Sequence, residues 1–346
     1  MLLGVDMKNI YGYTLEKLEN YFESIGEKKF KATQLFEWLY KKRVYSFDQM
    51  NNVKKDTIEI LKRDFSVDKV KIVDKKIGKD VCKYLFALSD HEHVEAVVMM
   101  HDYGKSLCVS TQVGCNMGCK FCESGRRKKV RNLNVEEMVT QYLVIEEDLG
   151  YRISHVVLMG IGEPFDNYEN VMDFIDILNT GKGIDLGARH ITVSTSGIVP
   201  KIKEFSENKR QVNLAISLHA PNNEIRNQIM PINKAYPLEV LIPTLKDYIN
   251  KTNRRLTFEY ILLNKVNDSK VCAVELSRLI KGMNAYVNLI PYNETSHIEY
   301  KKSSEKNITN FYETLKQEGI NVTIRREFGG EVDAACGQLR SKYEEG

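Results

Sequence analysis

The chain has 346 residues, of which 42% are hydrophobic and 28% are charged, a balance typical of soluble globular proteins. No apolar run approaches the about 18 residues that a membrane span needs, and no signal-peptide core follows Met1, so we expect a cytoplasmic protein. The net charge of +3 does not by itself indicate a nucleic-acid-binding protein. Inside the cell, the seven cysteines are more typical of metal ligands or reactive thiols than of structural disulfides.

Residues 1–75 are predicted to form a small helical accessory domain. Apolar residues recur at helical spacing after Thr14 and again in residues 31–40. Two shorter helices are expected near residues 46–50 and 54–65. The aromatic residues of this domain are more typical of a core than of a surface that stacks on bases, although a contact with RNA stays open.

Residues 76–105 are predicted to be a β extension that joins the helical domain to the rest of the chain. Apolar runs between turn signals indicate strands near residues 70–73, 84–88 and 93–100. A further strand at 106–110 leads directly into a loop that is rich in cysteine.

Strands and helices alternate through the third predicted domain, residues 106–346. Strands are expected at 153–159, 191–195, 212–218, 257–263, 286–290 and 322–325, and helices at 134–148, 168–179, 200–208, 237–250, 270–281 and 304–318. Asn134, followed three residues later by Glu137, is a typical helix start. This succession predicts an α/β fold, a barrel or partial barrel of parallel strands covered by helices.

Cys115, Cys119 and Cys122 follow a C-x3-C-x2-C pattern within that loop. Thiolates select soft metals and iron–sulfur clusters, and metal sites are recognised by such spacings. A four-iron cluster has four ligand positions, so three thiolates leave one iron open to a small molecule. The pattern therefore favours a catalytic cluster, while a zinc site with a distant histidine and three unligated cysteines stay open.

Five cations occupy the six positions from Arg126 to Arg131, directly after the cysteines. Single basic pairs elsewhere in the chain are more typical of solvated surface. A run of this length beside a cluster motif instead predicts a contact with phosphate.

Polar residues stand at the carboxyl ends of successive predicted strands, where barrel enzymes place their chemistry. Glu163 lies in a tight glycine turn in which a carboxylate could meet an ammonium group. The other hydrogen-bonding residues at these ends are Ser194, Ser217, His219 and Asn293. Each alone is an ordinary strand-end residue, but together they predict a ligand site on the same rim as the cysteine loop.

With these features the chain resembles the RlmN/Cfr family of radical S-adenosylmethionine (SAM) RNA methyltransferases. The matching strings include residues 108–115, 159–164, 217–222, 230–233 and 333–339. They are long and family-specific, and they extend over nearly the whole chain. The resemblance implies a radical SAM partial (βα)6 barrel behind the small N-terminal helical domain.

The resemblance also implies the cofactors, a [4Fe–4S] cluster and SAM. Cys115, Cys119 and Cys122 match the cluster ligands of the family, and the open iron would chelate SAM. The positions that match its SAM contacts are Gly162, Glu163, Ser194, Ser217, Leu218, His219 and Asn293.

A methyl carrier is implied as well, because C2 and C8 of adenine are poor nucleophiles and polar methyl transfer would not succeed there. By resemblance, a first SAM methylates Cys336, and a radical from a second SAM activates that methyl group, which then adds to the adenine. Cys108 would release the RNA–protein adduct by forming a disulfide with Cys336, and Glu95 would accept a proton.

Residues 162–167 favour the RlmN branch, so the sequence predicts methylation at C2 of an adenosine in 23S rRNA and in tRNA. The implied electron donor is a protein such as flavodoxin or ferredoxin, and nothing in the sequence indicates an oligomer, so we expect a monomer. Three alternatives stay open: a Cfr-type enzyme that methylates C8 and confers antibiotic resistance, a radical SAM enzyme with a non-RNA substrate, and a non-catalytic iron–sulfur or zinc RNA-binding module. Residues 123–129 depart from the small, uncharged stretch usual in the family; a carboxylate and a basic block beside the cluster bear on substrate preference rather than on the reaction type.

Overall fold

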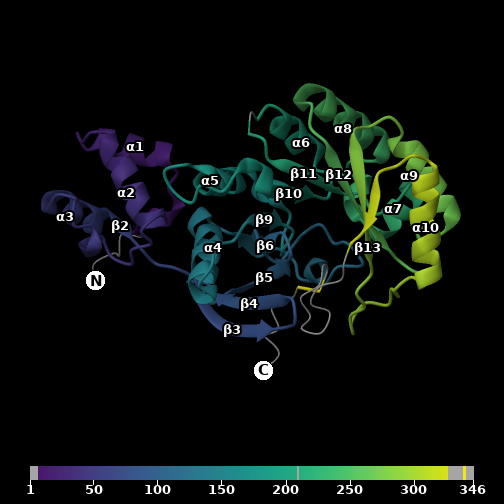
Figure 1. Ribbon diagram of the computed structural model, residues 1–346, viewed down its shortest axis with the longest axis horizontal. Helices are drawn as coiled ribbons and strands as arrows, with labels where there is room; N and C mark the ends of the chain where they lie inside the picture. The colour runs from purple at the N-terminus through teal and green to yellow at the C-terminus, as the bar shows by residue number, and fades with distance from the viewer. Residues whose placement is uncertain (1–6, 209, 326–337, 340–346) are drawn as a thin grey trace.

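The computed structural model describes residues 7–208, 210–325 and 338–339. A small helical unit lies at one end of a larger α/β body (Figure 1). Within the described residues no helix is long and apolar enough to cross a lipid bilayer.

The N-terminal unit is helical, as the sequence predicts. Its elements are β1 (Lys8–Asn9), a 3-10 turn (Ile10–Gly12), α1 (Leu15–Ser24), α2 (Phe30–Tyr40), a 3-10 turn (Phe47–Gln49), α3 (Lys55–Asp64) and β2 (Phe65–Ser66). The segment expected as a helix near residue 46 is thus a single 3-10 turn, because Ser46 and Gln49 close a capping box within three residues. Phe36, Trp38 and Tyr40 of α2 are buried and form core, whereas Phe30 at the start of the helix is exposed.

A ten-stranded sheet organises the rest of the molecule, in the order β14-β13-β12-β11-β10-β9-β6-β5-β4-β3. The strands are β3 (Lys71–Ile77), β4 (Val81–Ala87), β5 (His93–His101), β6 (Gly104–Cys108), β9 (His155–Leu158), β10 (Ile191–Thr195), β11 (Asn213–Ser217), β12 (Leu256–Leu262), β13 (Ala285–Pro291) and β14 (Val322–Ile324). The pairs from β6 to β14 are parallel, whereas β3, β4, β5 and β6 pair antiparallel. The predicted β extension therefore continues the same sheet.

Helices follow the parallel strands in the predicted alternation, which confirms the α/β fold class. They are α4 (Val135–Leu149), α5 (Tyr168–Asn179), α6 (Val199–Ser206), α7 (Asn223–Ile229), α8 (Leu238–Thr252), α9 (Lys270–Ile280) and α10 (Glu305–Gln317). The Asn134 backbone N–H donates to Glu137 Oε2 at 2.8 Å, so α4 starts where the capping pattern predicts. The sequence did not predict α7, because its seven residues hold too few apolar positions for a periodic pattern.

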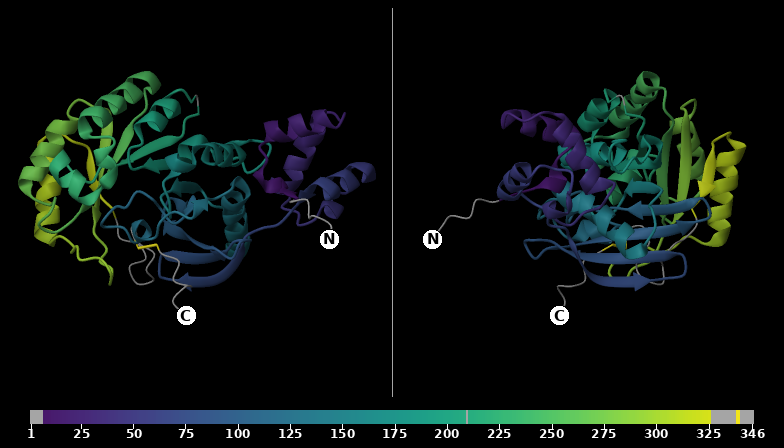
Figure 2. Two further views of the ribbon diagram at one scale, coloured as in Figure 1. Left: turned by 180° about the vertical axis from the view of Figure 1, so that it is seen from behind. Right: turned by 60° about the vertical axis from the view of Figure 1, so that its left-hand side comes forward.

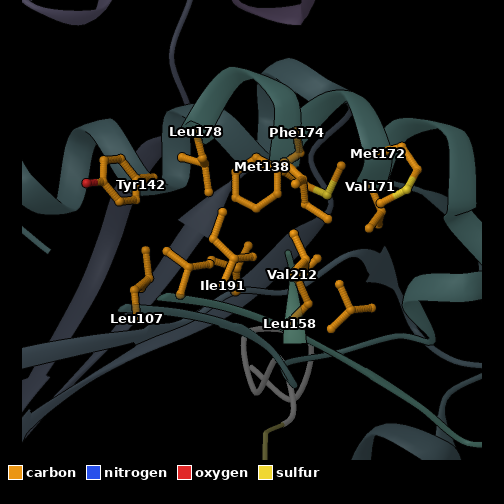
Figure 3. Packing of buried hydrophobic residues seen from close by; sticks show 14 of the residues in the cluster. Leu107, Met138, Tyr142, Leu158, Val171, Met172, Phe174, Leu178, Ile191 and Val212 are labelled. Atoms are coloured by element: carbon orange, nitrogen blue, oxygen red, sulfur yellow. The ribbon is translucent and has the colours of Figure 1, made fainter. Parts of the chain in front are cut away.

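The helices lie along the outer side of the curved sheet (Figures 1 and 2). Figure 3 shows the resulting core, in which Leu107, Leu158 and Ile191 from neighbouring strands face Met138 of α4 and Phe174 of α5. All five side chains are at most 1% exposed. This packing fixes the positions of the strand ends that carry the polar residues.

Candidate functional site

The cysteine loop begins after the carboxyl end of β6, and its two ends lie side by side. Its two ends pair antiparallel as β7 (Gln112–Val113) and β8 (Arg131–Asn132). Gly114 has φ +72°, and a Cβ atom there would lie 2.3 Å from the Lys128 carbonyl oxygen, so only glycine fits this crossing. The loop conformation is therefore set by backbone contacts at its base.

All three predicted cluster ligands line one cavity of about 160 Å³. Burial raises the pKa of Cys115 to about 12 and holds the pKa of Cys119 well above its usual value. Such thiols stay protonated at neutral pH until a cationic metal centre draws off their protons. Cys115 and Cys119 are therefore not reactive thiolates in the metal-free protein.

The arrangement fits a cluster better than a single ion. In the part of the chain that the structure describes, no three His, Cys, Asp or Glu side chains converge closely enough for one metal ion. A [4Fe–4S] cluster binds each thiolate to a different iron, so its ligands surround a wider space. Cys115, Cys119 and Cys122 around one cavity meet that requirement, whereas the zinc alternative finds no ligand set among these residues.

Helix α7 and an aromatic contact anchor the middle of the loop. The Lys120 backbone N–H donates to the Ile229 carbonyl oxygen at 2.9 Å, at the end of α7. The Phe121 ring packs edge-to-face on His219, with 4.9 Å between the ring centroids. These contacts place the cysteines against the carboxyl ends of β11 and β12.

Glu163 faces the same cavity from the turn after β9. Its Oε1 accepts from the Phe165 N–H at 3.0 Å, and its Oε2 accepts from the Ser196 N–H at 2.7 Å. Burial raises the pKa of this carboxyl group, and the two backbone hydrogen bonds oppose that rise. A ligand cation, such as an ammonium group, would further favour the charged form.

Gly162 lets this turn approach the cysteine loop. It has φ +112°, and a Cβ atom there would lie 2.7 Å from Gln112 Cβ. Gln112 Oε1 in turn accepts from the Glu163 N–H at 2.9 Å. The glycine turn and the base of the cysteine loop are therefore one rigid unit.

His219 is a neutral side chain with one assigned tautomer. Its Nδ1 accepts from the Ile261 N–H at 3.0 Å, so the ring proton of the neutral form lies on Nε2. Burial, and then the nearby Arg226 guanidinium, lower its pKa to about 3. The ring lines the cavity together with Ser194 and Ser217, two of the other predicted contacts from strand ends.

Arg226 is a residue of this region that sequence analysis missed. It is fully buried on α7, and its guanidinium donates to the Ser196 carbonyl oxygen at 2.6 Å, to the Leu218 carbonyl oxygen at 3.1 Å and to Asn233 Oδ1 at 2.8 Å. It thereby ties together the segments that follow β10 and β11. A lone arginine in a short polar helix carries no sequence signal that distinguishes it from a solvated residue.

Two predicted SAM contacts do not line this cavity. Leu218 packs in the main hydrophobic core, and Asn293 lies half-buried just beyond the end of β13. The assignment of both residues to SAM stays a prediction.

Cys108 and Glu95 lie on one face of the antiparallel part of the sheet. Cys108 is paired in register with Val97, which stands two residues after Glu95 on β5. Side chains two apart along a strand point to the same face, so the two residues are diagonal neighbours about 7–8 Å apart. Glu95 Oε1 lies 2.8 Å from the Lys83 ammonium group, and both side chains are buried.

Cys336 itself lies outside the described residues, but Leu339, three residues further along the chain, contacts this site. The Ser124 hydroxyl, two residues from Cys122, donates to the Leu339 carbonyl oxygen at 2.8 Å. The Leu339 side chain belongs to the small apolar cluster that contains Cys108. Leu339 thus contacts both the cysteine loop and the Cys108 face of the sheet.

The basic run after the cysteines is largely neutralised by ion pairs. Arg126 pairs with Glu123 at 3.1 Å and Arg127 with Glu92 at 2.8 Å. Lys129 pairs with Asp166 at 2.6 Å, and Arg131 pairs with both Asp90 and Glu137. Lys128 is exposed and makes no ion pair with the described residues. Four of the five cations therefore stabilise the loop, and the predicted phosphate contact stays a prediction for the run.

The strands form a partial barrel, and the three-cysteine loop and the turn that carries Glu163 both lie at the carboxyl ends of these strands. This arrangement is that of a radical SAM enzyme. A model of the Radical SAM superfamily matches residues 109–275. A model described as the ribosomal RNA large subunit methyltransferase N-terminal domain matches residues 8–67. The chain is 53% identical over 342 residues to a Spiroplasma citri protein named "Probable dual-specificity RNA methyltransferase RlmN", covering 98% of this chain and 99% of that protein. This chain belongs to the RlmN family.

Further relatives agree. An Enterococcus faecalis protein of the same name is 53% identical over 344 residues, which cover 97% of this chain and 96% of that protein. The crystal structure of a radical SAM methyltransferase from Sphaerobacter thermophilus superposes with a TM-score of 0.90 and 38% identity, covering 96% of this chain and 99% of that chain. As a radical SAM protein, the chain uses a [4Fe–4S] cluster and SAM.

Proposed function

We propose that this chain is an RNA methyltransferase that places a methyl group on C2 of an adenosine in 23S rRNA and in tRNA. The full-length similarity to proteins named as dual-specificity RNA methyltransferases supports the RNA substrate. One structural observation carries the reaction type: Cys108 shares an apolar cluster with Leu339, three residues after Cys336, and Ser124 binds the same leucine beside the cysteine loop.

Each part of the rim has a role in this proposal. Cys115, Cys119 and Cys122 hold the cluster, and Glu163 orients the amino group of SAM. When bound, the cluster and SAM together supply the methyl group and the radical that activates it. The neutral His219 ring and the serines at the strand ends bind the nucleoside part of SAM.

Cys336 carries the methyl group to the adenine and becomes linked to the RNA. The Cys108 thiolate then attacks the Cys336 sulfur. The disulfide bond forms as the bond between that sulfur and the transferred carbon breaks, and the released carbon takes up a proton to become the methyl group of the base. Glu95, which is diagonal to Cys108 on the same face, accepts the proton lost from the base. The Lys83 ammonium group fixes the position of that carboxylate.

The proposal extends to the cellular setting: a monomer in the cytoplasm, reduced by a small electron-transfer protein such as flavodoxin or ferredoxin. Cfr-type methylation at C8 is a second candidate. Residues 162–167, which follow the RlmN pattern, favour C2.

Nucleoside mass spectrometry tests the proposal. Anaerobically reconstituted protein, SAM and a reductant are incubated with a 23S rRNA fragment or a tRNA transcript, and digests are compared with 2-methyladenosine and 8-methyladenosine standards. We expect 2-methyladenosine from both RNAs and none from the Cys336→Ser variant. 8-Methyladenosine would establish the second candidate, and SAM cleavage without any RNA product would point to a non-RNA substrate.

A further inference from the structure

A groove of about 830 Å³ opens at the amino-terminal ends of β10, β11 and β12. It is lined by Thr192, Asn213 and Thr257, which stand at or next to the first residue of these strands. The cysteine cavity is lined instead by the last residues of β10 and β11 and those that follow. The two sites therefore lie at opposite ends of the same parallel strands.

The groove is strongly basic. Arg189, Lys251, Arg254 and Arg255 line it, and Glu207 is the only carboxylate among the described residues of its lining. Glu207 forms an ion pair with Lys251. Three arginines therefore remain without a compensating carboxylate in the described part of the chain.

The contacts of these arginines leave their charge available. Arg189 donates to Gln211 Oε1 at 2.7 Å, and Arg254 donates to the Val212 carbonyl oxygen at 3.3 Å. The Arg255 guanidinium lies 5.4 Å from the centre of the Tyr286 ring. All these partners are neutral, so they orient the guanidinium groups without cancelling the charge.

Aromatic side chains extend the groove toward the inside of the barrel. An adjoining cavity of about 660 Å³ shares Thr192 and Thr257 with the groove and contains His101 and Tyr103. Tyr103 is 69% exposed, and its ring stacks on His101 with 4.6 Å between centroids. An exposed, supported aromatic face in a cavity that adjoins the arginine-lined groove is suited to stacking on a nucleic-acid base.

We propose that this groove binds the phosphate backbone of the RNA substrate at a position remote from the target adenosine. This inference rests on the proposed function. Arginine forks match phosphate oxygens, and exposed aromatic rings add base stacking, a combination that suits RNA better than an acidic protein surface. The five to seven residues of β10, β11 and β12 span roughly 17–23 Å, so a different part of the RNA must reach the groove.

The length of the RNA therefore provides the test. The variant Arg189→Gln/Arg254→Gln/Arg255→Gln is compared with Lys246→Gln/Lys270→Gln/Lys306→Gln, which removes the same charge from exposed helix positions that make no ion pair within the described residues. Affinities are measured for a full tRNA transcript and for a short hairpin around the target adenosine, at about 50 and about 200 mM salt.

We expect the arginine variant to bind the full transcript about tenfold more weakly at low salt, with a salt dependence reduced by about two released ions. Binding of the short hairpin and the behaviour of the lysine variant should be unchanged. In turnover with the full transcript, KM should rise while kcat stays the same, since the groove takes no part in the chemistry. If the triple variant unfolds at a lower temperature than wild type, Arg189→Gln alone replaces it, with a proportionally smaller effect.

Other outcomes would overturn the inference. If the arginine variant and wild type bind the full transcript with equal affinity, the groove is ordinary solvated surface and does not bind RNA, even if methylation proceeds. Equal weakening for transcript and hairpin would show that the contact is not remote. A variant that binds both RNAs normally but is reduced more slowly by flavodoxin would assign the groove to an acidic protein. Wild-type protein that methylates no RNA would instead refute the proposed function.

Discussion

The two ends of the parallel sheet use charge in opposite ways. At the carboxyl end, Glu163 and Arg226 are buried, and backbone or side-chain partners fix each of them within 3.1 Å. At the amino end, Arg189 and Arg255 are exposed, and their partners among the described residues are neutral. Buried, fixed groups can orient a small cofactor for chemistry, whereas exposed, uncompensated cations give salt-dependent binding of a large anion.

The largest effect should follow from a substitution in the cysteine loop, at the carboxyl end of the sheet. Cys119→Ala removes one of three thiolates, and we expect SAM cleavage to fall by more than about 100-fold, since even outer-shell changes at metal sites cost 10–100-fold. Iron content and visible absorption after reconstitution measure the cluster directly. Cys272→Ala, a buried cysteine on α9, is the matched control. A Cys119→Ala protein with full iron content would refute the ligand assignment.

Arg226→Gln should destabilise the fold. The substitution leaves buried carbonyl oxygens of Ser196 and Leu218 without their charged donor, so the free energy of unfolding should fall by about 3 kcal/mol. Urea denaturation of the metal-free protein measures this. Arg189→Gln, at the amino end, should change it by less than about 0.5 kcal/mol. If both variants lose the same free energy of unfolding, the arginines at the two ends of the sheet do not differ in their structural role.

His219 should make stability depend on pH. Because its folded pKa of about 3 lies below its usual 6.5, only the unfolded chain binds the proton between these values. The wild-type free energy of unfolding should thus fall as the pH is lowered below 6.5, with a His219 contribution approaching about 1.4 kcal/mol per pH unit. His219→Asn, whose amide oxygen can accept from Ile261, should show a shallower decline. If the free energy of unfolding depends on pH in the same way in wild type and in the variant, the assignment of His219 as buried and neutral is wrong.

The smallest effect should come from the basic run beside the cluster. Lys128 is its single cation without an ion pair to the described residues, so Lys128→Gln should reduce the salt dependence of RNA binding by less than about one ion. The groove variant should have the larger effect in the same titration. If Lys128→Gln instead weakens binding more than the three arginine substitutions, the RNA backbone lies at the carboxyl end.

Local patterns were sufficient to predict the strands of the large sheet and most helices, since periodicity encodes them. The cysteine spacing predicted the cluster ligands, and the structure brings these three cysteines to one cavity. Long-range pairing was not visible: the sequence does not show that Arg127 meets Glu92 or that Lys129 meets Asp166. For the same reason the ion pairs of the basic run were not predicted, and the run was assigned to a contact with phosphate.

The groove was also invisible to sequence analysis. Arg189 and Arg254 precede different strands, and parallel pairing of those strands brings them to one edge. Arg226 was missed because burial, not residue type, makes it structural. Asn293 was predicted as a ligand-site residue from its place after a strand; it is not among the residues that line the cysteine cavity, and its assignment stays a prediction.

Methyl transfer through Cys336 with release by Cys108 is the central claim for the carboxyl end. It is tested by incubating the Cys108→Ala variant with SAM, a reductant and labelled RNA, followed by denaturing gel electrophoresis. The variant should accumulate a covalent RNA–protein band that wild-type protein lacks, since no thiol remains to attack the adduct. Normal yields of methylated RNA from Cys108→Ala, without such a band, would contradict the claim.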